Sequence, residues 1–204
     1  MIDLYTWHTP NGRKVSIMLE EIGMDYNVFP INIAKDEQFQ AYFLEVSPNN
    51  RIPAIVDKSN NDYALFESGA ILMYLAEKSG KLINKSNSDE YFRTMEWLMW
   101  QMGGVGPMFG QVHHFVKYNK GKSQYAEERY SKEARRLYSV MDKRLNSNQY
   151  ISGKEYSIAD ISIWPWTARF DWQEIDLNDF PNVARWYKEM IDRPAVQKGW
   201  LCLL

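Results

Sequence analysis

A segment with two prolines, residues 46–56, contains the first group of atoms that could bind a ligand. At its centre, Arg51-Ile52-Pro53 runs directly into the apolar residues 54–56, which we predict to be a strand. Pro53 has no N–H and constrains Ile52 toward extended geometry, so the Ile52 N–H and C=O stay available on one side. The Ile52 backbone is therefore a candidate hydrogen-bonding group.

A second polar group, Glu67-Ser68-Gly69, opens a predicted helix that ends near Gly80. The apolar residues Ile71, Leu72 and Leu75 share one face of this helix. A carboxylate, a hydroxyl and exposed amides at a helix start make a polar receptor for a small anionic ligand. The same residues also fit a β-hairpin and a capped helix that bind no ligand.

These groups need a scaffold, and the order of elements in residues 1–81 reads β-α-β-α-β-β-α. Strands are predicted at residues 2–5, 26–31, 54–56 and 64–66, and helices at 10–23, 39–46 and 67–80. Thr9 and Pro10 begin the first helix in the capping and first helical positions. One arrangement that this order permits is a mixed four-stranded sheet with helices on both faces, as in thioredoxin-like domains.

The remainder of the chain is predicted to be helical. Residues 82–88 form a polar linker, so we predict a thioredoxin-like domain at 1–81 and an all-α domain at 89–204. Helices are expected at 91–102, 123–146, 161–170 and 181–192. Glycines and a proline at 103–107 should kink or break the first of them.

Composition limits the possible functions. The 204 residues include 24 basic and 26 acidic side chains, a net charge of −2 that gives no reason to expect nucleic acid or an anionic membrane surface. The first residues lack a signal-peptide pattern, and no apolar run approaches the roughly 18 residues of a membrane span. The single cysteine cannot form an internal disulfide, which suits a reducing compartment. We therefore expect a cytoplasmic protein.

The two-domain order resembles that of the cytosolic glutathione transferases, over essentially the whole chain. The residues that carry the resemblance are Asn50 to Pro53, Glu67-Ser68, and Ser157-Ile158-Ala159-Asp160, which is similar to the family's capping box in the helical domain. The segments 9–12, 47–50, 103–108 and 111–115 are similar to the bacterial Nu class. Nu-class proteins are glutathione-dependent disulfide-bond reductases, and they resemble the globular part of the yeast nitrogen-catabolite regulator.

The resemblance implies a glutathione site in the first domain. In the family, Ile52 and Pro53 would hold the cysteinyl backbone, and Glu67 and Ser68 the γ-glutamyl group. Gln38 matches the residue that contacts the glycyl end of glutathione in this family. Arg51 adds positive charge near the tripeptide's carboxylates or is a solvated surface residue.

Glutathione chemistry needs a thiolate, and a helix N-terminus favours one. Thr9 and Asn11 match the positions that the Nu class associates with the glutathione sulfur, so we assign them the catalytic role. Thr9 is otherwise a plain helix cap. Tyr5 lies in the strand pattern and is interpreted as core.

The helical domain supplies further implied residues. Arg129 matches a position where the Nu class brings an arginine from the second subunit of a homodimer; otherwise it is an ion-pair partner on a charged helix. Glu96 stands where close relatives carry glutamine, which leaves its contact with ligand open, because a carboxylate there would repel a glutathione carboxylate. A cosubstrate pocket could include the aromatic residues Trp7, Phe109, His114 and Trp166.

We expect neither a metal nor a tightly bound cofactor, with glutathione as a substrate. His113 and His114 are adjacent on a predicted helix and lack companion ligands. Cys202 has no recognisable motif around it. The sequence contains no Cys-x-x-Cys pair, so the two thiols that any disulfide reduction consumes must come from glutathione and not from the protein. We predict thiol–disulfide exchange with small disulfides. Alternatives are conjugation to electrophiles, reduction of organic peroxides, or a non-catalytic glutathione-binding regulatory module.

Overall fold

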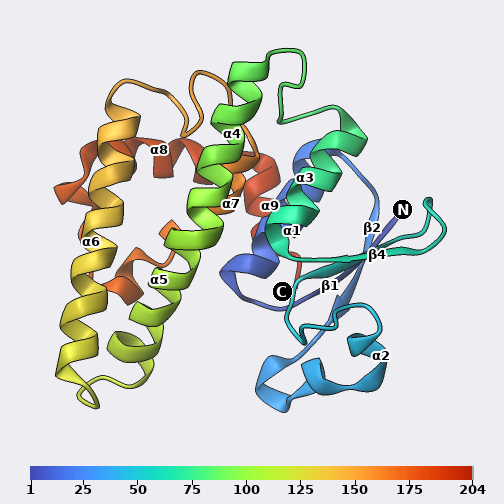
Figure 1. Ribbon diagram of the computed structural model, residues 1–204, viewed down its shortest axis with the longest axis horizontal. Helices are drawn as coiled ribbons and strands as arrows, with labels where there is room; N and C mark the ends of the chain where they lie inside the picture. The colour runs from blue at the N-terminus through green and yellow to red at the C-terminus, as the bar shows by residue number, and fades with distance from the viewer. Residues whose placement is uncertain (204) are drawn as a thin grey trace. The chain divides into compact units, whose positions relative to one another are not determined.

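The computed structural model describes residues 1–203, which form two compact units (Figure 1). The first unit combines residues 1–81 with residues 191–203, and the second contains residues 82–190. The sequence analysis places everything after residue 88 in the helical domain. The structure instead places residues 191–203 in the first unit, because a helix at residues 194–200 packs against a helix of that unit.

The first unit is built on a four-stranded mixed sheet in the order β2-β1-β3-β4. The strands are β1 (Ile2–Thr6), β2 (Tyr26–Pro30), β3 (Ala54–Asp57) and β4 (Tyr63–Phe66). β1 runs parallel to β2 and antiparallel to β3, and β3 runs antiparallel to β4. The predicted thioredoxin-like architecture is confirmed.

Helices cover both faces of this sheet. The helices α1 (Pro10–Ile22) and α3 (Ser68–Ser79) pack together on the face that includes the fully buried Ile2 and Leu4. Side chains alternate along a strand, so Tyr5 lies on the other face. There it packs against Phe29 and against Phe43 of α2 (Ala41–Leu44), as part of the core cluster expected from its strand position. α2 is shorter than predicted because two 3₁₀ turns, Ile33–Lys35 and Glu37–Phe39, precede it.

The helix α9 (Pro194–Trp200), which the sequence analysis does not predict, packs closely on α1. The carbonyl oxygen of Gly199 accepts a hydrogen bond of 2.7 Å from the Ser16 hydroxyl. A Cβ atom on Gly199 would lie 2.6 Å from both the Cα and the N of Ile17, so only glycine permits this approach. Arg193 forms two hydrogen bonds of 2.7 and 2.8 Å with Glu21. These contacts hold the chain's last helix in the first unit.

The second unit is helical, as predicted. Its helices are α4 (Ser88–Trp100), α5 (Gly106–Val112), α6 (Gln124–Asn146), α7 (Ile158–Thr167) and α8 (Pro181–Ile191). The glycines after α4 do not stop the helix; they form a π-helical turn, Gln101–Val105, that leads into α5. Pro107 lies in the first turn of α5, directly after this π-helical turn.

A capping box anchors the middle of this unit. The Ser157 hydroxyl accepts from Ala159 N, and the buried Asp160 carboxylate accepts from Ser157 N at 3.1 Å. Asp160 also accepts from the Ile151 amide at 2.8 Å and the Trp186 indole at 2.9 Å. One carboxylate thus joins the start of α7 to α8 and to the preceding loop. Among residues 1–203, none of the helices is both long and apolar enough to cross a membrane.

The glycine contact predicts a specific loss of stability. Gly199→Ala should lower the free energy of unfolding by about 1–3 kcal/mol, because the new methyl group meets α1 backbone that cannot rotate away. The matched control is Gly103→Ala, where nothing lies within 4 Å of the added Cβ. Urea unfolding of both variants measures the effect. Equal midpoints for Gly199→Ala and the wild type would show that α9 does not constrain α1.

Candidate functional site

The N-terminus of α1 is held in a tight, capped conformation. The Thr9 hydroxyl oxygen accepts from the Gly12 amide at 3.2 Å, and the Thr9 amide donates to the Trp7 carbonyl at 2.7 Å. A Cβ on Gly12 would lie 2.4 Å from both the Thr6 hydroxyl and the Trp7 carbonyl, so the helix begins pressed against the end of β1. Because the Thr9 oxygen serves as the acceptor, its hydroxyl hydrogen can donate to a ligand. Asn11 lies half-buried in the first turn.

The N-terminus of α3 contains strained backbone. Glu67, the residue before the helix, has φ 72° and ψ 110°, a region that non-glycine residues rarely adopt. Such a residue costs about 1–3 kcal/mol and persists where its surroundings fix it. Its carbonyl accepts the first helical hydrogen bond, from Ile71 at 2.9 Å. Glu67 is exposed, and the following Ser68 is buried.

The starts of α1 and α3 are linked by a lysine. Lys14 of α1 is fully buried, and its ammonium donates to the Ser68 hydroxyl at 3.2 Å. Burial lowers the pKa of Lys14 to about 7, and the nearby Glu67 carboxylate opposes that shift. Two helix N-termini, each at the positive end of a helix dipole, therefore lie together at one part of the first unit.

The other predicted site residues of this unit lie on the loops between its elements. The Ile52-Pro53 peptide is cis and comes directly before β3, whose ladder begins at Ala54. The Ser47 hydroxyl donates to the Arg51 carbonyl at 2.8 Å, while the Arg51 side chain is exposed. Gln38 lies in a 3₁₀ turn with 9% of its surface exposed. Its buried Oε1 accepts no hydrogen bond from residues 1–203, so it can accept one from a ligand.

The far end of α3 is fixed by a buried carboxylate. Asp57, at the end of β3, accepts from the Tyr74 hydroxyl at 2.6 Å and pairs with Lys78 at 2.8 Å. The Ser59 amide and hydroxyl donate to it at 2.9 and 2.7 Å. Burial alone would raise the pKa of Asp57, but these donors outweigh it and hold the pKa well below its usual range. Because Tyr74 and Lys78 belong to α3, this network sets the helix against the sheet.

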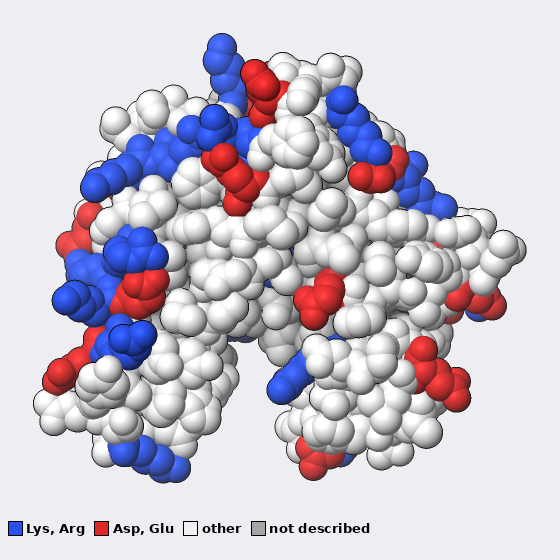
Figure 2. Space-filling model, in the orientation of Figure 1, with Lys and Arg blue, Asp and Glu red and all other residues white. Residues whose placement is uncertain are grey.

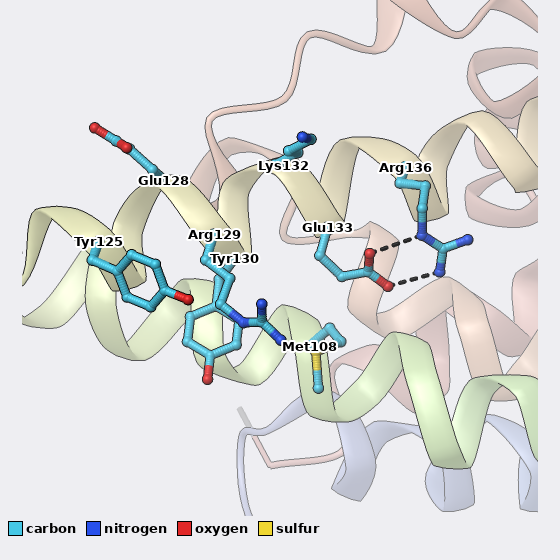
Figure 3. A pocket seen from close by; sticks show the side chains of 8 residues that line it. All are labelled: Met108, Tyr125, Glu128, Arg129, Tyr130, Lys132, Glu133 and Arg136. Carbon is cyan, nitrogen blue, oxygen red and sulfur yellow. Dashed lines mark hydrogen bonds and ion pairs between the residues drawn. The ribbon is translucent and has the colours of Figure 1, made fainter.

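In the second unit, Arg129 lies in a pocket of about 700 Å³ along α5 and α6 (Figure 3). Figure 3 shows its guanidinium beside the Tyr130 ring, on the side toward Met108, while Glu128 and Lys132 point away. Nearby, Arg136 makes two hydrogen bonds of 2.7 and 2.8 Å with Glu133. The exposed side of α6 therefore carries charges of both signs, as Figure 2 shows.

The proposed aromatic pocket residues of the second unit do not share one surface. Phe109 is fully buried and stacks on Tyr138 with ring centres 5.1 Å apart, so it belongs to the core and not to a pocket wall. Trp166 is 8% exposed and stacks on His113, whereas His114 is exposed. An aromatic residue at helical spacing fits a core and a pocket equally well, which is why the pattern did not separate them. In the first unit, Trp7 is half-buried and contacts His8 edge-on at 5.0 Å.

His113 is buried among polar and aromatic side chains of the second unit. Its Nε2 lies 3.2 Å from the Gln173 side-chain nitrogen, which also donates to the Trp166 carbonyl. Burial, with the Arg169 charge, lowers the pKa of His113 to about 4, so the ring is neutral at pH 7. No cluster of three or more potential metal ligands occurs among the described residues.

Two further residues have simple surroundings. Burial raises the pKa of the Cys202 thiol, so it is protonated at neutral pH. Glu96 is half-exposed and pairs with Arg93 at 2.6 Å on α4.

Lys14 is the site residue that the sequence analysis missed. The available signal was its register: Lys14 lies four residues before Met18 and eight before Ile22, both on the apolar face of α1. A lysine at the head of an apolar stripe indicates a buried charge that needs a partner.

Comparison with known proteins agrees with this geometry. The family model for the glutathione S-transferase N-terminal domain matches residues 1–77, and that for the C-terminal domain matches residues 105–194. A disulfide-bond oxidoreductase, YfcG of Escherichia coli, is 47% identical over 98% of this chain and 95% of its own length. The chain belongs to the glutathione S-transferase family.

Solved structures of the family are equally similar. A glutathione transferase family member from Pseudomonas fluorescens, with two glutathione bound, has a TM-score of 0.92 and 45% identity over 98% of this chain and 92% of that one. A glutathione transferase from Pseudomonas putida, with one glutathione disulfide bound per subunit, has a TM-score of 0.91 and 43% identity. It covers 98% of this chain and 90% of that one.

The Asp57 network predicts an acid-sensitive stability. Asp57→Ala should lower the free energy of unfolding by about 2–4 kcal/mol at pH 7, because it leaves Lys78 and Tyr74 without their buried acceptor. A carboxyl with a depressed pKa stabilises the fold above its unfolded value of about 4 and loses that effect as pH falls toward the folded value. The difference between wild type and variant should therefore shrink from pH 5 to pH 3.

The control is Lys58→Ala, which removes the exposed partner of Asp62, 2.8 Å away, and should change stability by less than about 1 kcal/mol. Urea midpoints at pH 7, 5 and 3 measure all three proteins. A difference between wild type and Asp57→Ala that stays constant over this range would contradict the depressed pKa.

Proposed function

We propose that this chain is a glutathione-dependent disulfide-bond reductase of the Nu class. The observation that carries the proposal is the capped N-terminus of α1, where the Thr9 hydroxyl can donate its hydrogen at the positive end of the helix dipole. This environment favours a bound thiolate over a thiol. Because burial keeps Cys202 protonated, the reacting thiols come from glutathione. The relative YfcG, named a disulfide-bond oxidoreductase, supports the same reaction class.

Glutathione binding divides among groups that the first unit supplies. Glu67 pairs with the γ-glutamyl ammonium, and Ser68 with the amides of α3 binds the γ-glutamyl carboxylate. The Ile52 backbone pairs with the cysteinyl backbone next to Pro53, and the buried Gln38 Oε1 accepts a hydrogen bond near the glycyl end. Arg51 adds positive charge toward the carboxylates. Asn11 and Thr9 then donate to the sulfur.

The reaction is two successive thiol–disulfide exchanges. The bound glutathione thiolate attacks one sulfur of a small disulfide, forming a mixed disulfide and releasing one thiolate, which takes a proton from solvent. A second glutathione thiolate attacks the glutathione sulfur of the mixed disulfide and releases the second thiolate. Two glutathiones are oxidised to glutathione disulfide while one disulfide is reduced to two thiols. A site that holds two glutathiones or one glutathione disulfide, as those relatives do, suits this sequence.

We further propose that the protein is a cytoplasmic homodimer in which Arg129 reaches the partner subunit's site. The exposed Arg129 guanidinium in the α5–α6 pocket supports this role, because it can bind a glutathione carboxylate bidentately. The cytoplasmic location is supported by the need for a reduced glutathione pool and by a single, protonated cysteine.

The primary test is reduction of 2-hydroxyethyl disulfide by glutathione, coupled to glutathione reductase. Asn11→Ala should lower kcat/KM about 10–100-fold, which corresponds to loss of a hydrogen bond to a charged sulfur. The control is Asn27→Ala, which removes an exposed amide that donates to Asp3 at 2.9 Å and should leave turnover unchanged. Wild-type protein that binds glutathione without reducing the disulfide would overturn the reductase proposal. It would direct the search to electrophiles, peroxides and protein partners in turn.

The role of Arg129 is tested by mixed dimers. A dimer that combines an Asn11→Ala subunit with an Arg129→Ala subunit has one intact site if Arg129 acts across the interface, and none if it acts within its own subunit. We expect the mixed dimer, isolated with two affinity tags, to keep about half of the wild-type turnover. If the mixed dimer turns over no faster than the two single-variant homodimers, Arg129 does not act in the site of the other subunit.

A further inference from the structure

The last helix of the first unit, α9, packs on α1 and reaches the turn where the proposed sulfur site begins (Figure 1). Trp200 is the final residue of α9, and the Arg13 guanidinium lies over its ring, with the guanidinium carbon 3.6 Å from the ring centroid. Arg13 is only 7% exposed. The attraction between a cation and a tryptophan face is strongest where water is excluded. Trp200 therefore holds the Arg13 side chain against α9.

Arg13 is also part of the first turn of α1. Its amide donates to the Thr9 carbonyl at 3.1 Å, in a hydrogen bond that closes this turn. The fully buried Ser16 hydroxyl donates to two carbonyls, that of Arg13 at 3.2 Å and that of Gly199 in α9 at 2.7 Å. The backbone and the side chain of Arg13 are thus both connected to α9.

The residue before Arg13 is fixed by the sheet instead. A Cβ atom on Gly12 would lie 2.4 Å from both the Thr6 hydroxyl and the Trp7 carbonyl, so Gly12 lies directly against the end of β1. Successive residues of a helix point about 100° apart, so Gly12 and Arg13 meet different surroundings. The first turn of α1 is therefore held by β1 through one residue and by α9 through the next.

We propose that Trp200 is a positioning residue for the disulfide reduction: through Arg13 it fixes the first turn of α1, and with it Thr9 and Asn11, relative to the glutathione sulfur. This inference rests on the proposed function. In that function the cysteinyl backbone is held by Ile52 before β3, whereas the donors to the sulfur belong to α1. Hydrogen bonds stabilise a thiolate only at short distance and good alignment, so a small displacement of this turn should raise the pKa of the bound thiol.

The test measures the pKa of the bound glutathione thiol, followed by the ultraviolet absorbance of the thiolate. In wild type this pKa should lie below the value of about 8.5 for a free thiol. Trp200→Leu keeps an apolar side chain without an aromatic face, and it should raise the pKa of the bound thiol by about 0.5–1. Affinity for S-methylglutathione, which has no thiol to ionise, should change less than about 2-fold, because the other contacts to the tripeptide remain.

Two controls separate this role from general packing. Trp200→Phe keeps an aromatic face and should bring the pKa of the bound thiol back close to the wild-type value. Arg193→Met removes hydrogen bonds of 2.7 and 2.8 Å to Glu21, which joins α9 to the other end of α1. It should lower the urea midpoint without changing the pKa of the bound thiol.

A second variant tests the same contact from α1 and decides the matter if Trp200→Leu does not fold. Arg13→Lys keeps the positive charge but loses the planar guanidinium that stacks on the ring. It should raise the pKa of the bound thiol in the same direction. The double variant of Arg13→Lys and Trp200→Leu should show no further rise, because both changes remove one interaction.

An unchanged pKa of the bound thiol in folded Trp200→Leu, or in Arg13→Lys, would overturn the role of Trp200. An equal rise in Arg193→Met would overturn it too, because the effect would then come from loosening α9 in general. Both results leave the glutathione site standing. If wild type binds no glutathione, or binds it without lowering the pKa of its thiol, the proposed function fails and this inference fails with it.

Discussion

The first unit depends on buried polar contacts at the two ends of α3. At the C-terminal end, Asp57 takes hydrogen bonds from Tyr74 and Lys78 and sets the helix against the sheet. At the N-terminal end, Lys14 holds Ser68 against α1. Apolar packing between helices tolerates small slides and rotations, whereas paired buried charges penalise them strongly. The position of α3 is therefore specified by electrostatics as well as by shape.

This double attachment explains how strained backbone can persist at Glu67. The residue lies between β4 and α3, and both neighbours are held by contacts that do not involve its own side chain. Its unfavourable φ and ψ angles are consequently imposed by the fold, and its carboxylate is free to serve binding. Thr9 occupies a comparable position before α1, between the end of β1 and a helix that cannot shift, because Gly12 already touches the Trp7 carbonyl region. Both helix starts are therefore held in place by contacts within the first unit.

Much of this arrangement could be predicted from the sequence because the signals are local. Each cap, at Thr9 or at Ser157, is formed by residues within one helical turn. The apolar spacing of a long helix is likewise visible over a few neighbouring residues. The missing features depend on contacts between distant residues. The hydrogen bond from Ser16 to Gly199 joins residues 183 positions apart, and nothing near Gly199 indicates that a helix backbone lies against it. Phe109 and Lys14 show the same limit, since periodicity gives the face of a helix but not what covers it.

The return of α9 to α1 has a consequence for how the protein is made. The first unit is discontinuous: residues 1–81 emerge from the ribosome before their partner helix α9, and the helical unit of residues 82–190 lies between them in the chain. Until then the surface of α1 around Ser16 and Ile17 lacks its cover. The first unit can therefore complete its packing only after residues 194–200 have been synthesised, by which time residues 82–190 have already been made. The unit whose synthesis begins first is thus the one whose chain is completed last.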